Sequence, residues 1–335
     1  MYLPKFTLER PKSIEAAVNL LGSGEDTKLL SGGTDLFPRM KYKLCTPEVL
    51  ISLKYLPSCP SQIDEHGKLI IDAKMSLTAM TLSPEIQKKA PLLAKAAQMV
   101  ATREIRNMGT IGGNICQETR CLYLNQTHTF QFIEPCLKRG GTVCYFAPKG
   151  KKCWAVFMSD TAPALFCLNA DVIISDLNGE HQIPIEKIYT GDSLKPLSLG
   201  PDQIITKVVV PETQGPSGSG FAKFTVRDTI EFAVVNIGVF LETEKNLETC
   251  KQARITVGAV FGAPQRALEA EDWLAGKNLS QENINKASQK IAGSLKIMPH
   301  HGYSKSYLTE CLKTQSRQAL SDAVKELTDQ NIGGR

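Results

Sequence analysis

The segment 211–220, rich in Gly, Pro and Ser, is the feature that most limits how this chain of 335 residues can fold. Such stretches separate packed units. After it come two or three segments with strand character and then three with helical spacing: Phe221–Arg227, Phe232–Glu242 and Ala253–Val260, then Arg266–Leu274, Gln281–Ser294 and Tyr303–Leu327. Strands followed by a run of helices predict a separate α+β domain with a small antiparallel sheet, which we place at 220–330.

The sequence before this segment indicates two smaller lobes. In 1–58 the expected order is strand, helix, strand, Gly-rich turn and helix, with Ser13 capping the first helix. From Leu69 the pattern changes, and 59–212 is expected to form a second lobe. Its expected elements are a strand at Leu69–Ala73, helices at Pro91–Ala101 and Asp160–Leu168, and a strand at Ala170–Asp176. The predicted fold class is therefore α+β, with two N-terminal lobes and a C-terminal domain.

Composition excludes several classes of protein. The formal net charge of +5 arises from 39 basic and 34 acidic side chains spread along the whole chain, so no nucleic-acid partner is expected. No stretch approaches the roughly 20 apolar residues of a membrane helix. The beginning, 1–11, lacks the apolar centre of a secretory signal. We therefore expect no membrane association and a cytoplasmic location.

Two glycine turns stand out, Ser31-Gly32-Gly33-Thr34-Asp35 and Thr110-Ile111-Gly112-Gly113-Asn114. Neither matches the Gly-x-Gly-x-x-Gly dinucleotide fingerprint or the phosphate loop of nucleotide triphosphatases. Glycine tolerates positive φ and lets a ligand approach the main chain, so each turn can expose successive backbone N–H groups. Two such turns facing each other would hold a diphosphate. The alternative for each is a tight turn without a ligand.

The cysteines are unevenly distributed. Five of the ten lie between Cys116 and Cys153, in a polar stretch rich in Lys and Gly. In a reducing compartment such clustering favours metal ligation over disulfides. Thiolates suit both iron–sulfur clusters and zinc, and the spacing contains no Cys-x-x-Cys to choose between them. Cys116 is interpreted as a packing residue. The interleaved lysines either lower the pKa of the thiols or form a solvated surface.

Three motifs resemble the FAD-binding (medium) subunits of the xanthine dehydrogenase and CO dehydrogenase family of molybdenum hydroxylases. They are Leu29-Leu30-Ser31-Gly32-Gly33-Thr34-Asp35-Leu36, Ile105-Arg106-Asn107-Met108-Gly109-Thr110-Ile111-Gly112-Gly113-Asn114 and Ser159-Asp160-Thr161-Ala162-Pro163-Ala164-Leu165. The similarity continues through Phe221–Phe224 and Ala253–Leu274, so it covers nearly the whole chain. It implies the two-lobed FAD-binding domain of this family followed by its C-terminal flavoprotein domain.

The resemblance implies FAD as cofactor and substrate chemistry in another subunit, with no catalytic residue in this chain. The implied FAD-binding residues are Leu29, Leu30, Ser31, Gly32, Gly33, Thr34, Asp35, Leu36, Thr110, Ile111, Gly112, Gly113, Asn114, Asp160 and Lys223. Both glycine turns would hold the diphosphate, Asp160 would contact the flavin nucleotide, and Lys223 would lie near the isoalloxazine ring. The alternative for Lys223 is a solvated lysine on a strand.

One departure from the family is informative. Asn114 and Asp160 are separated by 45 residues, where most family members have a short stretch. An insertion at about 116–158, with Thr119-Arg120-Cys121 at its start, is similar to the β subunits of 4-hydroxybenzoyl-CoA reductases. That resemblance implies a [4Fe-4S] cluster, with the ligands Cys121, Cys136, Cys144 and Cys153.

The expected function is that of an electron-transfer subunit. Its implied partners are a large subunit with the molybdenum cofactor, a small [2Fe-2S] subunit and a low-potential donor such as a ferredoxin. Electrons would pass through the [4Fe-4S] cluster and FAD to the partner clusters and molybdenum, for reductive dehydroxylation of an aryl-CoA in aromatic degradation. Two alternatives stay open: the FAD subunit of an oxidative heteroaromatic hydroxylase, and a zinc-stapled scaffold without catalytic function.

Overall fold

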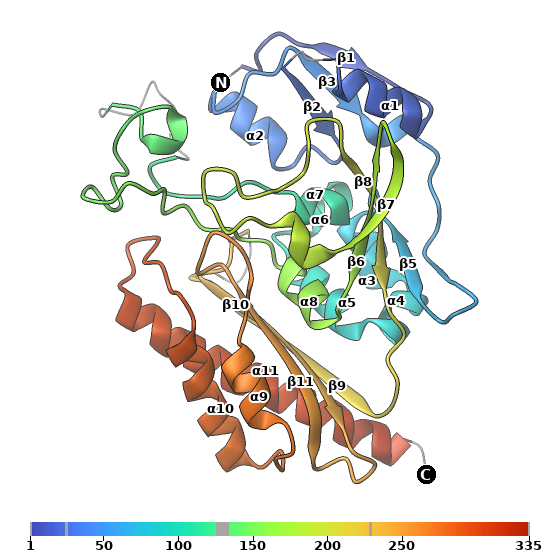
Figure 1. The fold of residues 1–335 in the computed structure, drawn as a ribbon, viewed down its shortest axis with the longest axis vertical. Coiled ribbons are helices and arrows are strands. Elements are labelled where there is room, and N and C mark those ends of the chain that lie inside the picture. The colour runs from blue at the N-terminus through green and yellow to red at the C-terminus, as the bar shows by residue number, and fades with distance from the viewer. Residues whose placement is uncertain (1, 24–25, 125–133, 228–229, 334–335) are drawn as a thin grey trace.

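The computed structural model describes residues 2–23, 26–124, 134–227 and 230–333 (Figure 1). Residues 125–133 of the predicted insertion therefore lie outside the described residues. The described chain forms three sheets with helices packed around them. The α+β prediction is confirmed. None of the described helices has both the length and the apolar character needed to cross a membrane.

The first lobe is a small parallel sheet with helices beside it. Its elements in chain order are β1 (Thr7–Glu9), α1 (Ile14–Leu21), β2 (Thr27–Leu30), α2 (Leu36–Lys41) and β3 (Val49–Ser52). The strand order is β1-β3-β2, and both pairings are parallel. As predicted, Ser13 caps α1, because its side chain accepts a hydrogen bond from Ala16 N at 3.2 Å. The first glycine turn leaves the carboxyl end of β2.

The second lobe is an antiparallel sheet with short helices against it. Its strands are β4 (Gln62–Ile63), β5 (Leu69–Asp72), β6 (Asp171–Asp176), β7 (Gly179–Pro184) and β8 (Ile204–Val210), in the spatial order β4-β5-β8-β6-β7. Its helices are α3 (Leu77–Leu82), α4 (Pro84–Lys89), α5 (Pro91–Gln98), α6 (Arg103–Met108), α7 (Ile111–Ile115) and α8 (Thr161–Cys167). Helix α5 is shorter than predicted, because Ala101 has a positive φ of 43° that no right-handed helix can contain.

The C-terminal domain has one sheet covered on both faces. It comprises β9 (Ser217–Phe224), β10 (Val235–Thr243), β11 (Cys250–Gly258) and β12 (Gln265–Arg266), then α9 (Leu268–Leu274), α10 (Gln281–Ser294) and α11 (Lys305–Gly333). The order β12-β11-β10-β9 is antiparallel. Strand β9 begins four residues earlier than expected and takes up part of the Gly-rich segment, because its glycines leave room for a helix.

Glycine on β9 is what lets α11 lie directly on the sheet. A Cβ at Gly218 would lie 2.1 Å from Ala323 O, and a Cβ at Gly220 would lie 2.0 Å from Ala319 O. Phe221 and Phe240 join the core of the second lobe, whereas Ala222 and Val239 join the core beneath α9–α11. The sheet is therefore the middle layer between the second lobe and the C-terminal helices (Figure 1).

We expect Gly220→Ala to lower the free energy of unfolding by about 1–3 kcal/mol, because the added methyl forces α11 away from the sheet. The control is Gly293→Ala in α10, where nothing lies within 4 Å of the added Cβ. That substitution should be neutral or stabilise by up to about 1 kcal/mol, since alanine favours a helix interior. Urea unfolding of both variants measures the difference, and equal stabilities would contradict this packing.

Candidate functional site

The two glycine turns, which lie far apart in sequence, meet between the two N-terminal lobes. Ser31 Oγ lies 2.9 Å from Thr110 Oγ1, within hydrogen-bonding distance. At Gly32 an added Cβ would lie 1.8 Å from Met108 O. Glycine is needed at this position because the backbones of the two lobes almost touch there. The predicted juxtaposition of the two turns is therefore present.

The first turn has free backbone donors. Gly33 has a φ of +72°, a conformation that favours glycine. Among the residues that the structure describes, the N–H groups of Gly32, Gly33, Thr34 and Asp35 donate to no protein acceptor. Four successive amides without partners at the carboxyl edge of a parallel sheet suit an anion such as a diphosphate.

The second turn differs from the sequence-based expectation of exposed amides. Ile111 N donates to Met75 O at 3.1 Å, and Gly112 N donates to Ala73 O at 2.8 Å. Gly113 N donates to Thr110 Oγ1 at 3.1 Å, and Asn114 N donates to Thr110 O at 2.9 Å. These amides form and anchor the N-terminal turn of helix α7. The segment therefore presents the Thr110 hydroxyl, and not a row of N–H groups, to the first glycine turn at 31–35.

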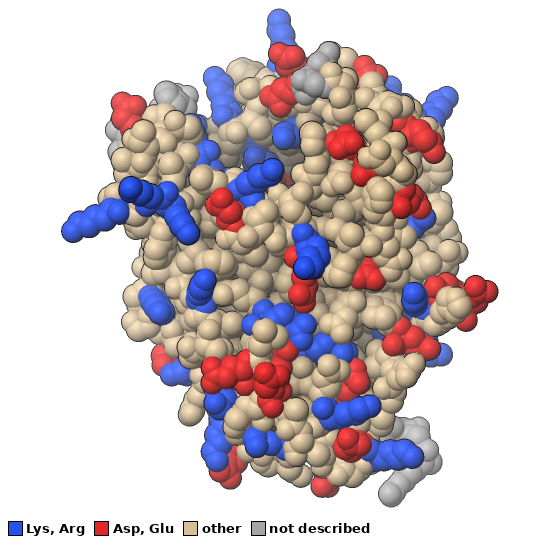
Figure 2. Space-filling view, in the orientation of Figure 1, with Lys and Arg blue, Asp and Glu red and all other residues tan. Residues whose placement is uncertain are grey.

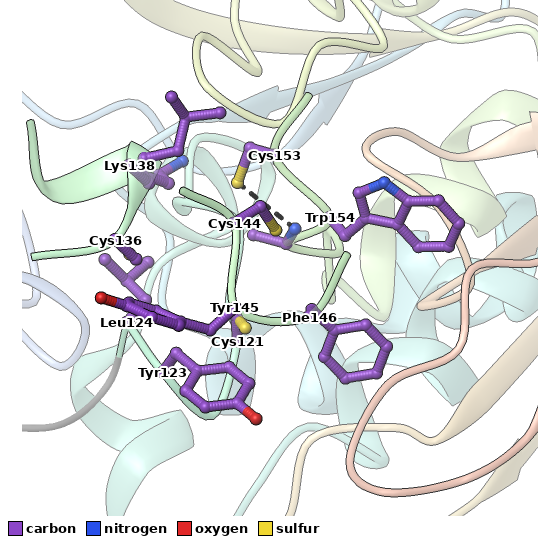
Figure 3. Close-up of a pocket in the computed structure, with 12 residues that line it drawn as sticks. Cys121, Tyr123, Leu124, Cys136, Lys138, Cys144, Tyr145, Phe146, Cys153 and Trp154 are labelled. Atoms are coloured by element: carbon purple, nitrogen blue, oxygen red, sulfur yellow. Dashed lines mark hydrogen bonds between the residues drawn. The ribbon is translucent and has the colours of Figure 1, made fainter. Parts of the chain in front are cut away.

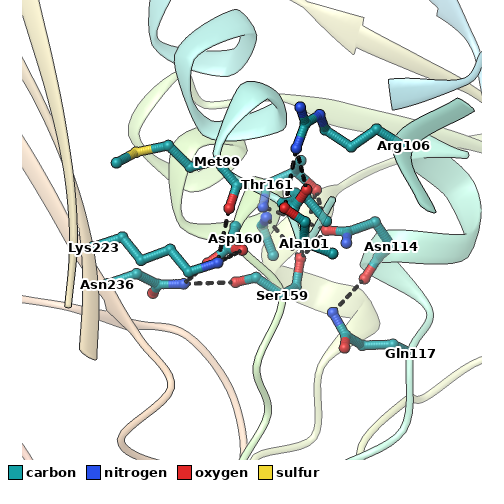
Figure 4. A network of polar contacts seen from close by, with 12 residues as sticks. Met99, Ala101, Arg106, Asn114, Gln117, Ser159, Asp160, Thr161, Lys223 and Asn236 are labelled. Atoms are coloured by element: carbon teal, nitrogen blue, oxygen red, sulfur yellow. Dashed lines mark hydrogen bonds and ion pairs between the residues drawn. The ribbon is translucent and has the colours of Figure 1, made fainter. Parts of the chain in front are cut away.

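The Asn114 side chain fixes the third motif. Its Oδ1 accepts hydrogen bonds from Ser159 Oγ at 2.6 Å and from Thr161 Oγ1 at 2.7 Å (Figure 4). Gln117 Nε2 donates to the backbone carbonyl of Asn114 at 3.1 Å. The Gly-Gly-Asn motif and the Ser-Asp motif are thus one hydrogen-bonded unit, although the insertion separates them in sequence.

Asp160 joins the second lobe to the C-terminal domain (Figure 4). Its carboxylate accepts hydrogen bonds from Lys223 Nζ at 2.6 Å and Asn236 Nδ2 at 2.7 Å. Lys223 on β9 and Asn236 on β10 are directly paired in the sheet. Lys223 Nζ also donates to Met99 O at 2.8 Å. The side chains of Asp160 and Lys223 are only 4% and 5% exposed, so Lys223 is not a solvated lysine.

The pKa of Asp160 at this junction is subject to opposing effects. Burial raises the pKa of Asp160 above its usual value, while the Lys223 ammonium and the Asn236 amide act to lower it. A lysine has three N–H donors, and Met99 and Asp160 use two of those of Lys223. As far as the described residues go, one donor of Lys223 is therefore left for a further acceptor. Asn236 was not singled out from the sequence, because nothing in its neighbourhood there indicates its partner on the other domain.

The four cysteines of the insertion converge. Cys121, Cys136, Cys144 and Cys153 line one small enclosed hollow, together with Lys138 and aromatic and apolar side chains (Figure 3). Cys116, which was interpreted as a packing residue, is not among the residues that line this hollow. Burial raises the pKa of Cys116 to about 12.

The surroundings of the hollow favour the protonated form of two of its thiols, those of Cys121 and Cys153. Burial raises the pKa of Cys121 and Cys153, although the Lys138 ammonium acts to lower the pKa of Cys153. Of the two interpretations of the interleaved lysines, a lowering effect on the pKa of a thiol is present for Lys138 on Cys153, where desolvation is the larger effect. In the described part of the chain, no three His, Cys, Asp or Glu side chains are arranged to hold a single metal ion.

Lys138 anchors the insertion to the second lobe. Its Nζ donates to Glu118 Oε2 at 2.8 Å, to Thr119 Oγ1 and to the Ser193 carbonyl. Its side chain is only 10% exposed. Arg120, the residue before Cys121, extends in the other direction and forms an ion pair with Asp35 of the first glycine turn. From the sequence, Lys138 was expected only as one of the basic residues among the cysteines and Arg120 only as part of the motif at the start of the insertion, so neither contact was predicted.

A model of the FAD binding domain in molybdopterin dehydrogenase matches residues 4–213, more than half of the chain. The chain belongs to this flavoprotein family. A model of the CO dehydrogenase flavoprotein C-terminal domain matches residues 221–323. The chain is thus an FAD-binding medium subunit of the xanthine and CO dehydrogenase family, as the sequence motifs predicted, and the flavoprotein component of an oxidoreductase complex.

Relatives of known activity align along most of their length. The chain is 28% identical over 324 residues to the nicotine 6-hydroxylase medium subunit of Paenarthrobacter nicotinovorans. The aligned region covers 96% of this chain and 99% of the relative. It is 27% identical over 290 residues to the carbon monoxide dehydrogenase medium chain of Hydrogenophaga pseudoflava, covering 86% of each chain.

Solved structures show the same fold. A carbon monoxide dehydrogenase from Hydrogenophaga pseudoflava superposes with a TM-score of 0.80 at 24% identity and covers 97% of this chain and 99% of its own. A chain of quinoline 2-oxidoreductase from Pseudomonas putida 86 gives 0.78 at 19% identity, covering 97% and 99%.

We expect Asp160→Asn to lower the free energy of unfolding by about 3–5 kcal/mol, because it leaves the Lys223 ammonium buried without a counter-charge. The matched control is Asp322→Asn, which removes the partner of Lys95 from a more exposed pair and should cost less than about 1 kcal/mol. Urea unfolding of FAD-free protein measures both changes. Similar losses in the two variants would show that the buried pair does not hold the domains together.

Proposed function

We propose that this chain carries electrons through FAD and a [4Fe-4S] cluster within a molybdenum enzyme. The residues that would hold FAD are Leu29, Leu30, Ser31, Gly32, Gly33, Thr34, Asp35, Leu36, Thr110, Ile111, Gly112, Gly113, Asn114, Asp160 and Lys223. When bound, FAD supplies the exchange between two-electron and one-electron transfer. Support comes from the family match and from the free amides of 32–35.

The chain's own residues divide the work of binding. The amides of the first turn hold the phosphates, and Ser31 with Thr110 keeps the two lobes in register. The Lys223 ammonium, with one donor free, stabilises negative charge on the flavin side of the site. Asp160 and Asn236 keep Lys223 in place, because the pair is buried and hydrogen-bonded on both oxygens of the carboxylate.

The insertion is where the cluster would be held, and its convergent cysteines carry this part of the proposal. Four thiols around one enclosed hollow match the ligand number of a [4Fe-4S] cluster. Zinc takes the same number of thiolates, and metal analysis separates the two. The raised pKa of Cys121 and Cys153 means that ligation expels protons, so assembly is favoured as pH rises.

Cys136→Ser should abolish the broad brown absorbance of the purified protein and, with FAD supplied in excess, keep the yellow flavin bands, because it removes a ligand of the cluster and none of the residues of the glycine turns. The control is Cys116→Ser, the same chemical change at a cysteine outside the hollow, which should keep both colours. Absorbance spectra with iron, sulfide and zinc analysis measure the outcome. Unchanged brown absorbance in Cys136→Ser, or zinc in place of iron in the native protein, would contradict the assignment.

The partners that we propose are a large subunit with the molybdenum cofactor and a small subunit with [2Fe-2S] clusters. Electrons would enter from a low-potential donor such as a ferredoxin, pass through the [4Fe-4S] cluster and FAD, and reach molybdenum for reductive dehydroxylation of an aryl-CoA. The support is the insertion itself, which is similar to that of the 4-hydroxybenzoyl-CoA reductase β subunits and which converges on one hollow.

A second candidate is the FAD subunit of an oxidative hydroxylase, in which electrons leave through FAD. The relatives favour it, since the similar medium subunits include those of nicotine 6-hydroxylase and carbon monoxide dehydrogenase. The two candidates share the flavin site and differ in the direction of electron flow.

Redox titration of the purified complex distinguishes the two directions. In the reductive enzyme we expect the [4Fe-4S] potential to lie at least about 60 mV below the flavin potential, a tenfold preference for one-electron transfer into FAD. A cluster potential well above that of the flavin could not feed it efficiently and would favour the oxidative candidate. Electron paramagnetic resonance of the cluster, together with flavin absorbance, follows both centres in one titration.

A further inference from the structure

Arg120 occupies the base of the insertion and is held there by its backbone. Arg120 N donates to Val156 O at 2.7 Å, and Val156 N donates to Arg120 O at 2.9 Å. This antiparallel bridge joins the two ends of the insertion. Cys121 follows Arg120 directly, and Cys153 lies three residues before Val156, so two of the four thiols at the hollow are close in sequence to the bridge.

The Arg120 side chain contacts parts of the protein other than the insertion. Its Nη2 forms an ion pair with Asp35 Oδ1 in the first glycine turn, and its guanidinium carbon lies 4.0 Å from the centre of the Phe232 ring in the C-terminal domain. The Arg120 Nε atom is buried and has no partner in the described structure. One side chain therefore links the insertion, the first lobe and the C-terminal domain at the proposed diphosphate site.

The charges around the first turn are unbalanced. Burial lowers the pKa of Arg120, the Asp35 carboxylate acts to raise it, and Arg39 nearby acts to lower it. Asp35 is the counter-charge of Arg120, and the charge of Arg39 also acts on Arg120, so two cations lie in this region with one paired carboxylate. Within the ranges of the chain that the structure describes, four amides of the same turn have no partner, and neither does Arg120 Nε. This excess of positive charge and of donors suits a dianionic phosphate group, whereas Asp35 without Arg120 would repel it.

We propose that Arg120 is a positioning residue of the FAD site, and that through it FAD binding depends on the metal cluster of the insertion. The proposal rests on the function proposed above. A cluster bound to Cys121 and Cys153 would fix both ends of the insertion next to the Arg120–Val156 bridge, and so fix the guanidinium that neutralises Asp35. Coupling of this kind is reciprocal: bound FAD would in turn stabilise the cluster.

Titration of FAD-free full-length protein with FAD, followed by the quenching of flavin fluorescence, tests the proposal. Arg120→Gln should weaken FAD binding about tenfold to a hundredfold, the effect of losing a charge-assisted contact. The cluster-free Cys136→Ser variant should bind FAD about tenfold more weakly than the wild type. Lys151→Gln, which removes a charge from the exposed part of the same insertion, should bind FAD as the wild type does.

Second-site rescue separates positioning from a merely structural role. Asp35→Asn in the Arg120→Gln background should restore about tenfold in FAD affinity, because the carboxylate that Arg120 neutralised is then gone. In the double variant Cys136→Ser with Arg120→Gln, loss of the cluster should cause no further weakening. If Arg120→Gln fails to fold, Arg120→Lys serves instead. It keeps the charge, loses the planar fork, and should weaken FAD binding about threefold to tenfold.

Three results would overturn the proposal: wild-type FAD affinity in Arg120→Gln, no rescue by Asp35→Asn, or equal FAD affinity in the native protein and in Cys136→Ser. These differ from failure of the proposed function itself. If the native protein binds FAD but contains no iron and sulfide, the proposed cluster is wrong. If it holds a cluster and its FAD affinity does not depend on that cluster, only the proposed coupling is wrong.

Discussion

The placement of the domains depends on one buried carboxylate. Asp160 precedes α8 in the second lobe, and its two oxygens are held by Lys223 and Asn236 from neighbouring strands of the C-terminal sheet. A buried charge without a partner would cost several kcal/mol of folding free energy. The second lobe and the C-terminal domain are therefore held in the arrangement in which Lys223 and Asn236 reach the Asp160 carboxylate. The sheet that supplies both donors is covered on its other face by α9–α11, so the contact with Asp160 is backed by the packed core of the C-terminal domain.

The two glycine turns have similar sequences but different structural roles. In the first turn Gly33 adopts a positive φ, and among the described residues the N–H groups of 32–35 have no acceptor. In the second turn Gly112 allows close packing, since a Cβ there would lie 2.8 Å from Ala73 O. The amides of 111–114 are used by the fold, and Asn114 in turn organises Ser159 and Thr161. A motif with two glycines therefore positions the Ser-Asp motif rather than offering a second row of donors.

Sequence reasoning was strongest where a local pattern is enough. The α+β class and the cap at Ser13 follow from turn chemistry and hydrophobic periodicity, which act over a few residues. The domain boundary near 211–220 rests on the same kind of pattern and stays a prediction. Arg120 and Asn236 could not be found in this way, because their partners Asp35 and Asp160 lie 85 and 76 residues away. The convergence of the four cysteines came from family resemblance, since their spacing alone does not specify a cluster. The start of β9 was misplaced because its glycines resemble a linker until α11 is seen lying on them.

The two hydrogen bonds between Arg120 and Val156 also bear on how such a chain can change over evolutionary time. Because these residues are paired across an antiparallel bridge, the entry and exit of the extra segment lie side by side, and a short turn would suffice to connect them. A segment with adjoining ends can be gained or lost as a unit without altering the register of the sheets on either side. Chains of this family can therefore differ in the length of this segment without any change to the lobes that flank it.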